Sequence, residues 1–267
     1  MSFIKEIFKV EKPVIGMVHL APLPGSPSYR PDFGLDKILK RALNDAEALV
    51  KGGVDGILIS NEGDAPYLFR VGPETVAVMT FMVTKISSEH SIPFGVDVLW
   101  DPYATIAVAK ATGAHFVRTL LVGVHASDIG LINTECAKVL RYKRAIDADN
   151  VKVFVYLNPE FATPLSQRPL ELVAKAVAFM SIADALCISG PMTGMPTRVK
   201  DLKAVKSAVP HMPVIINTGA NKENIKDLLP YADGVIVGTS LKKGGITWNP
   251  VDINRVKEFM EVVNTLR

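Results

Sequence analysis

The sequence is poor in cysteine, and its two cysteines, Cys136 and Cys187, stand far apart. Two cysteines are too few for a disulfide framework or a zinc site, so we expect two small buried side chains. The chain also lacks an apolar run close to the roughly 20 residues that a membrane-spanning helix needs. The first residues, MSFIKEIFKVEKP, lack the apolar centre and cleavage site of a secretory signal. These absences predict a cytoplasmic protein without a transmembrane segment.

The chain also lacks a strong excess of positive or negative charge. The formal net charge is +3, and the lysines and arginines are scattered instead of forming a basic face. Aromatic residues do not alternate with basic ones as they do in proteins that bind single-stranded nucleic acid. We therefore expect no nucleic-acid partner. Hydrophobic residues make up 48% of the chain, which is enough for a large buried core and excludes disorder as the default interpretation.

Short apolar runs alternate with longer segments of helical period along the whole chain. The predicted strands are Val14–His19, Gly56–Ser60, Phe94–Leu99, Phe116–Leu120, Val151–Leu157, Ala185–Ser189, Val214–Asn217 and Gly234–Val237. The predicted helices are Leu35–Lys51, Glu74–Glu89, Tyr103–Thr112, Ser127–Ile146, Pro169–Ser181, Arg198–Ala208, Lys222–Leu229 and Val251–Leu266. Eight strand–helix units in strict alternation predict parallel strands that close into a (β/α)8 TIM barrel, an α/β fold. No linker interrupts residues 1–267, so we expect one domain.

Several segments favour structural roles in this barrel. Glycine or Asp-Gly ends predicted helices in KGGVDG, KATGAHF and PYADGV, which places these turns, and His115, at the end of the barrel away from the chemistry. The apolar residues Phe3, Ile4, Ile7 and Phe8 predict a hydrophobic lid over one barrel end, with peripheral membrane contact as the alternative.

Residues that follow the strands of such a barrel meet at one mouth, and here many are polar. The candidate catalytic residues are His19, Glu62, Asp64, Asp97 and Arg118. Asp101 and Glu160 add two further carboxylates. Clustered carboxylates repel each other, which raises the pKa of at least one and suits it to general acid or base work. A divalent cation could gather them instead, and solvated loop charges are a third interpretation. A strand arginine needs a carboxylate or an anionic substrate as its partner.

The loops after the seventh and eighth strands predict a phosphate site. They contribute Gly219, Asn221, Gly238, Thr239, Ser240 and Lys242, with Lys243 as an alternative cation. Glycine leaves the backbone N–H groups open to an anion, and hydroxyl and ammonium groups add donors. Short turns with helix caps are the alternative. The Gly- and Thr-rich loop SGPMTGMPT after the sixth strand adds Ser189, Gly190, Thr193 and Gly194 as candidate substrate-binding residues.

The segment GMVHLAPLPGSPSY resembles the opening signature of the BtpA family, and NEGDAPY, ADALCISGPMTGMPT and DGVIVGTSLKKGG extend the similarity along the chain. The resemblance implies a ribulose-phosphate-binding type of barrel, with His19, Glu62, Asp64, Thr193, Gly194, Gly238 and Lys242 at family positions. One branch of the family is associated with photosystem I biogenesis. In DVLWDP, VYLNPEFATPL and NTG, this sequence departs from the usual family pattern.

These observations favour an enzyme that acts on a small phosphorylated sugar or nucleotide-like metabolite by acid–base chemistry. The main alternative is a non-catalytic biogenesis or assembly factor, and a divalent-metal hydrolase is a third interpretation. No organic cofactor is indicated, and a homo-oligomer is expected because exposed barrel helices often pair.

Overall fold

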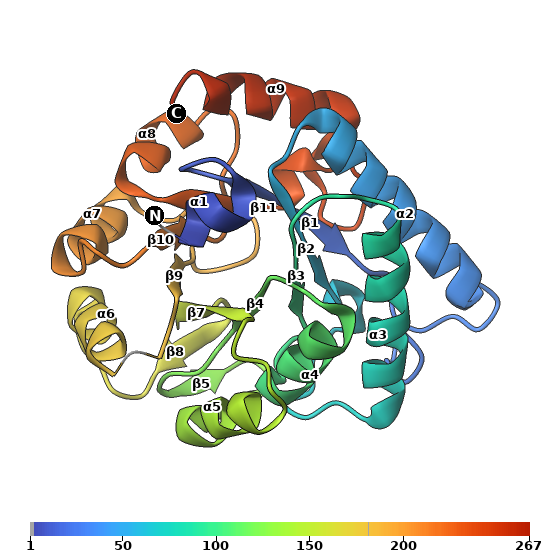
Figure 1. Cartoon of the computed structure of the whole chain (residues 1–267), viewed down its shortest axis with the longest axis horizontal. Helices are drawn as coiled ribbons and strands as arrows, with labels where there is room; N and C mark the ends of the chain where they lie inside the picture. The colour runs from blue at the N-terminus through green and yellow to red at the C-terminus, as the bar shows by residue number, and fades with distance from the viewer. Residues whose placement is uncertain (1–2, 181) are drawn as a thin grey trace.

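Eight parallel strands form a closed barrel in the computed structural model, which describes residues 3–180 and 182–267 (Figure 1). In chain order they are β1 (Val14–His19), β2 (Gly56–Ser60), β3 (Phe94–Asp97), β4 (Phe116–Thr119), β7 (Lys152–Asn158), β9 (Ala185–Ile188), β10 (Val214–Ile216) and β11 (Gly234–Val237). Each of these strands pairs with the barrel strand that precedes it and the one that follows it in the chain, and β11 pairs with β1 to close the barrel. The predicted (β/α)8 barrel is confirmed.

Helices follow the strands and surround the barrel (Figure 1). They are α2 (Gly34–Gly52), α3 (Pro73–Ser88), α4 (Pro102–Thr112), α5 (Cys136–Ala145), α6 (Leu170–Phe179), α7 (Val199–Ala208), α8 (Ile225–Leu228) and α9 (Ile253–Asn264). Short 3-10 turns are η1 (Glu62–Asp64), η2 (Leu229–Tyr231), η3 (Thr239–Leu241) and η4 (Lys243–Gly245). Within the described residues, no helix is both long and apolar enough to cross a membrane.

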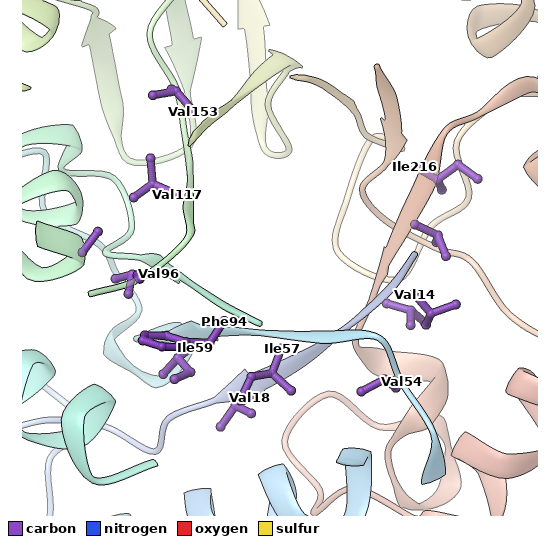
Figure 2. Close-up of a cluster of buried hydrophobic side chains, with 14 of the residues drawn as sticks. Val14, Val18, Val54, Ile57, Ile59, Phe94, Val96, Val117, Val153 and Ile216 are labelled. Carbon is purple, nitrogen blue, oxygen red and sulfur yellow. The ribbon is translucent and has the colours of Figure 1, made fainter. Parts of the chain in front are cut away.

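Alternation along the strands divides the core into two layers. Val14, Val18, Ile57 and Ile59 belong to a large cluster that also contains helix residues such as Leu49 (Figure 2). The intervening strand residues fill the barrel interior, among them Ile15, Met17, Leu58, Phe116 and Phe154. Because neighbouring side chains on a strand point to opposite faces, the same alternation turns His19 inward at the end of β1.

The N-terminal helix α1 (Phe3–Phe8) closes one end of the barrel (Figure 1). Ile4 and Phe8 are buried in the interior cluster, and the Phe8 ring lies 5.6 Å from the Phe116 ring, centroid to centroid. Phe3 and Ile7 pack against the same cluster. The predicted hydrophobic lid is confirmed, because its apolar face is covered by the barrel.

Aspartates tie the strands together at this same end. Asp55 accepts a hydrogen bond from the backbone N–H of Val14 at 2.8 Å, and Asp184 and Asp233 bind the starts of β7 and β10 in the same way. Each aspartate directly precedes one strand and binds the backbone of the adjacent strand, which fixes the register of the pair. His115 also lies here, where its Nδ1 accepts from the N–H of Phe94 and its ring packs edge-on against Phe94.

The predicted helix Ser127–Ile146 is wrong in its first part. Residues of that segment form a hairpin of β5 (Val124–Ser127) and β6 (Gly130–Asn133), and only α5 is helical. A third short strand, β8 (Ala162–Pro164), pairs antiparallel with β5. The alternation that buries His125 and Ile132 while Val124 and Leu131 stay exposed is a strand pattern, and the turn at Asp128 and Ile129 reverses the chain.

Candidate active site

A pocket of about 270 Å³ opens at the carboxyl ends of the barrel strands. It is lined by ten of the fifteen residues that the sequence singled out: His19, Glu62, Arg118, Thr193, Gly194, Gly219, Asn221, Gly238, Thr239 and Ser240. Glu62 and Gly238 therefore share one cavity although 175 residues separate them in the chain. The parallel strands bring these residues together because all eight end at the same rim.

Arg118 organises the floor of the pocket. Its Nε donates to Oδ2 of Asp97 at 2.7 Å, and its Nη1 donates to Oδ1 of Asn217 at 3.0 Å. Tyr156 donates from its hydroxyl to the same Asp97 oxygen at 3.2 Å, and the guanidinium lies 5.1 Å from the Tyr156 ring centroid. All four side chains are buried. The expected carboxylate partner of the strand arginine is thus Asp97, and the bonds hold Arg118 in one position.

Glu62 faces His19 across the pocket. Oε2 of Glu62 lies 3.9 Å from Nε2 of His19, too far for a hydrogen bond but close enough for one small group or a water to bridge them. Burial raises the pKa of Glu62 to about 7, with Glu160 and Asp97 adding to the rise and Arg118 opposing it. Burial also lowers the pKa of His19 well below its ordinary value. Near neutral pH the site therefore holds a neutral imidazole and a carboxyl group able to give or take a proton.

Glu160 is the second carboxylate in the pocket. Its Oε1 accepts from Nδ2 of Asn217 at 3.2 Å, and that amide nitrogen also donates to Oγ of Ser189 at 2.8 Å. Burial raises the pKa of Glu160. Asn217 therefore connects Glu160 to Arg118, so a change at one group alters the electrostatic environment of the other.

The loops after β10 and β11 form another side of the pocket, next to His19 at the end of β1. Oγ of Ser240 donates to the carbonyl of Ala220 at 2.6 Å, which joins the two loops. Thr239 and Thr247 share a hydrogen bond between their hydroxyls at 2.8 Å. Arg255 of α9 lines the pocket and donates from Nε to the carbonyl of Ser240 at 2.7 Å. This side offers glycine backbone, hydroxyls, the amide of Asn221 and one guanidinium, together with the exposed carboxylate of Glu223.

Two glycines here are required by close packing. A Cβ on Gly238 would lie 3.0 Å from Cε1 of His19, so the glycine makes room for the imidazole. Gly219 has φ +69°, and a Cβ there would lie 2.2 Å from the backbone of Met195. The second contact seats the loop after β9 against the loop after β10.

Five of the predicted residues lie outside the pocket lining. Asp97 lies beneath it and acts on Arg118, as described. Lys242 is buried and pairs with Asp45 of α2 at 3.0 Å, so its ammonium group does not reach the pocket. Asp64 accepts from the backbone of Leu23 at 2.7 Å and from Asn61. Ser189 and Gly190 bind neighbouring loop side chains, the first through Asn217 and the second through Thr218.

The prediction missed residues that the structure brings to the pocket. They include Tyr67, Trp100, Tyr156, Asn217, Glu223 and Arg255. Tyr156 and Asn217 could have been found from strand alternation, because they continue the inward-facing sets of β7 and β10. Arg255 lies inside the last helix, where the sequence offers no sign that its side chain returns to the mouth.

The carboxylates do not assemble into a metal site. Asp101 caps α4 by accepting from the N–H groups of Tyr103 and Ala104, and Asp64 is held by backbone. Across residues 3–180 and 182–267, no three histidine, cysteine or acidic side chains come together in a way that could hold a metal ion. Both cysteines are free, Cys187 buried and Cys136 half-buried.

Solved structures of similar fold include two enzymes whose names contain a phosphorylated compound. The chain is similar to (S)-3-O-geranylgeranylglyceryl phosphate synthase from Thermoplasma acidophilum, solved with sn-glycerol-1-phosphate, with a TM-score of 0.64, 13% identity and coverage of 98% of this chain and 97% of that one. It is also similar to thiamine phosphate pyrophosphorylase from Pyrococcus furiosus, with a TM-score of 0.59, 16% identity and 96% coverage of both. At these identities the likeness concerns the fold.

Relatives in sequence match over nearly the full length. The putative sgc region protein SgcQ of Escherichia coli is 42% identical over all of both chains. The photosystem I biogenesis protein BtpA of Synechocystis is 37% identical over 97% of this chain and 90% of its own. The model of the BtpA family matches residues 10–265. The chain belongs to the BtpA family.

Proposed function

We propose that the protein is an enzyme that acts on a small phosphorylated metabolite by acid–base chemistry at the mouth of the barrel. The observation that carries the proposal is that one pocket holds both a buried Glu62, whose pKa burial raises to about 7, and a wall of glycine backbone with Arg255. Such perturbed groups cluster at catalytic sites. The similarity in fold to a barrel solved with sn-glycerol-1-phosphate and to thiamine phosphate pyrophosphorylase supports the same class of ligand.

The phosphate would lie between the loops after β10 and β11. There the backbone N–H groups at Gly219 and Thr239 supply donors, and Arg255 supplies the positive charge that Lys242 does not. With the phosphate fixed at this side, the rest of the substrate extends across the pocket toward Glu62 and His19.

Proton transfer is assigned to Glu62. A carboxyl group with a pKa near 7 is available in both protonation states at neutral pH, as a general acid or base requires. His19 is neutral and buried, and its Nε2 lies 3.9 Å from Oε2 of Glu62, so we assign this nitrogen to contact with the substrate. Arg118, held by Asp97 and Asn217, would stabilise negative charge that develops on the substrate.

The alternative of a non-catalytic assembly factor is supported by the similarity to the photosystem I biogenesis protein BtpA of Synechocystis. An assembly surface would not require two carboxylates and an arginine to be buried at the bottom of a cavity. The cost of burying these groups therefore favours catalysis.

Calorimetric titration with inorganic phosphate and ribose 5-phosphate tests the anion site. We expect both to bind the wild type, and Arg255→Ala to weaken both by about 10- to 100-fold, as removal of a charge-assisted hydrogen bond does. Lys257→Ala removes the same charge from an exposed position of α9 and should leave binding unchanged. Equal affinity in the wild type and in Arg255→Ala would contradict the assignment of the phosphate side.

A further inference from the structure

A second cavity, of about 500 Å³, lies beside the pocket. We call it the apolar cavity. It shares a wall with the pocket, formed by Glu62, Tyr67, Trp100, Glu160, Phe161 and Thr193. The two spaces therefore meet at the buried carboxylates, and a ligand can occupy both at once.

The remaining walls of the apolar cavity come from three separate segments. Ala65 and Pro66 follow η1, Ile129 and Ile132 belong to the hairpin of β5 and β6, and Trp248 lies between η4 and α9. Trp248 is 55% exposed, which is unusual for so large an apolar side chain unless something covers it. The walls are thus mainly aromatic and aliphatic. The polar exceptions are the hydroxyls of Ser127, Thr193 and Thr247 and the carboxylates of Asp128, Glu62 and Glu160.

Contacts outside the cavity hold these walls in place. The Trp100 ring packs on the Tyr156 ring with centroids 5.6 Å apart, which ties it to the barrel floor. The hairpin turn is fastened by the N–H of Asp128, which donates to the carbonyl of Phe161 at 3.1 Å. Arg41 of α2 donates to the carbonyl of Trp248. The cavity is therefore formed before any ligand arrives, as small-molecule sites commonly are.

Size and chemistry together indicate the ligand. A dry cavity of about 150 Å³ already accepts benzene, so the apolar cavity has room for a larger ring system. Tryptophan and tyrosine faces stack on flat rings, and a few polar groups among them can bind ring heteroatoms. A purely hydrophilic sugar phosphate would leave these aromatic faces exposed to water.

We propose that the substrate carries an aromatic or similarly flat apolar group in addition to its phosphate. The phosphate occupies the side near Arg255, the flat group occupies the apolar cavity against Trp100 and Trp248, and the reacting atoms lie between them, next to Glu62 and Glu160. This inference rests on the proposed function, because it places the two ends of one substrate in two connected spaces.

Four matched probes separate the two ends: ribose, ribose 5-phosphate, adenosine and AMP, with uridine and UMP as a second ring. Calorimetric titration of the wild type should give at least tenfold tighter binding of AMP or UMP than of ribose 5-phosphate. Trp248→Ser should remove most of that gain, about tenfold, because base–aromatic stacking is lost, and should leave the affinity for ribose 5-phosphate unchanged. Leu131→Ser changes an exposed apolar residue of the β5–β6 hairpin that does not line the cavity, and it should alter neither affinity.

The outcomes distinguish this inference from the proposed function. If ribose 5-phosphate binds but neither base adds affinity, or if the added affinity survives in Trp248→Ser, the inference is overturned and the phosphate site stands. If the bases add affinity but the phosphate adds none in any pair, the phosphate site is overturned and the apolar cavity stands.

Discussion

At the scale of single residues, the chemistry of the site depends on which partner each buried charged side chain has. Arg118 and Lys242 are both buried cations, but Arg118 faces the pocket with Asp97 beneath it, whereas Lys242 is turned away to Asp45. Burial raises the pKa of Glu62, and the only described basic side chain within salt-bridge distance is His19, which is neutral and does not offset this rise. Glu62 is therefore the buried carboxyl group that we assign to proton transfer, because no hydrogen-bonded cation offsets the cost of burying its charge.

The pKa of Glu62 makes a prediction about stability. In the folded protein Glu62 keeps its proton up to about pH 7, whereas its ordinary pKa is 4.5. The folded state therefore binds more protons between these values, and its stability falls as the pH rises through that window. Glu62→Gln removes the buried negative charge, so we expect its melting temperature to exceed that of the wild type by about 5 °C at pH 8.5 and to match it at pH 5.

Differential scanning calorimetry at the two pH values measures this difference. Glu261→Gln, an exposed glutamate of α9, serves as the control and should shift neither melting temperature. A Glu62→Gln variant with the same shift at pH 5 and pH 8.5, or one less stable than the wild type at pH 8.5, would show that Glu62 is not protonated at neutral pH.

Residue types alone located most of the pocket but not Arg255, the cation of its phosphate side. His19, Glu62 and Arg118 were predicted because polar residues at strand ends stand out against apolar runs. Lys242 was predicted for the same reason, and its burial against Asp45 depends on a contact across 197 residues that no local pattern reveals. Arg255 reaches the pocket from a helix, where an arginine ordinarily indicates only a solvated face.

At the scale of elements, the barrel strands were predictable because parallel strands buried on both faces read as continuous apolar runs. The predicted bounds of three of the eight strands match the structure at both ends, and the bounds of the other five differ by one or two residues. The hairpin of β5 and β6 was missed because its two short strands pair only with each other and with β8, across a turn without the usual Asn-Gly signal. That missed element carries part of the apolar cavity.

The helix α1 allows a test at this scale. Phe8 is 4% exposed and packs on Phe116 inside the barrel. Phe8→Ala should lower the free energy of unfolding by about 3 kcal/mol or more, because it leaves a cavity in the interior layer. Urea denaturation followed by circular dichroism measures the loss, and binding of ribose 5-phosphate by the remaining folded protein should be unchanged because the pocket lies at the other end of the barrel.

Lys5→Ala, on the exposed face of the same helix, is the matched control and should change stability by less than about 0.5 kcal/mol. If Phe8→Ala were as stable as the wild type, α1 would not be the lid of the barrel interior, and its apolar face would need another partner.

At the scale of the whole molecule, the closed barrel converts distant segments into one site with two sides. Aspartates and α1 stabilise one end of the barrel, and all the proposed chemistry lies at the other end. The sequence predicted this division from strand–helix alternation, because the direction of parallel strands decides which loops meet. It could not predict the two connected cavities, since their shape depends on how loops and a missed hairpin pack together.

The most direct test of the account is a crystal structure of the protein with ribose 5-phosphate bound. The account predicts phosphorus density between the loops after β10 and β11, within reach of Gly219, Thr239 and Arg255, with the sugar directed toward Glu62. A phosphate bound at the α1 end or on the outer helices, with the pocket at the strand ends left free of ligand, would contradict it.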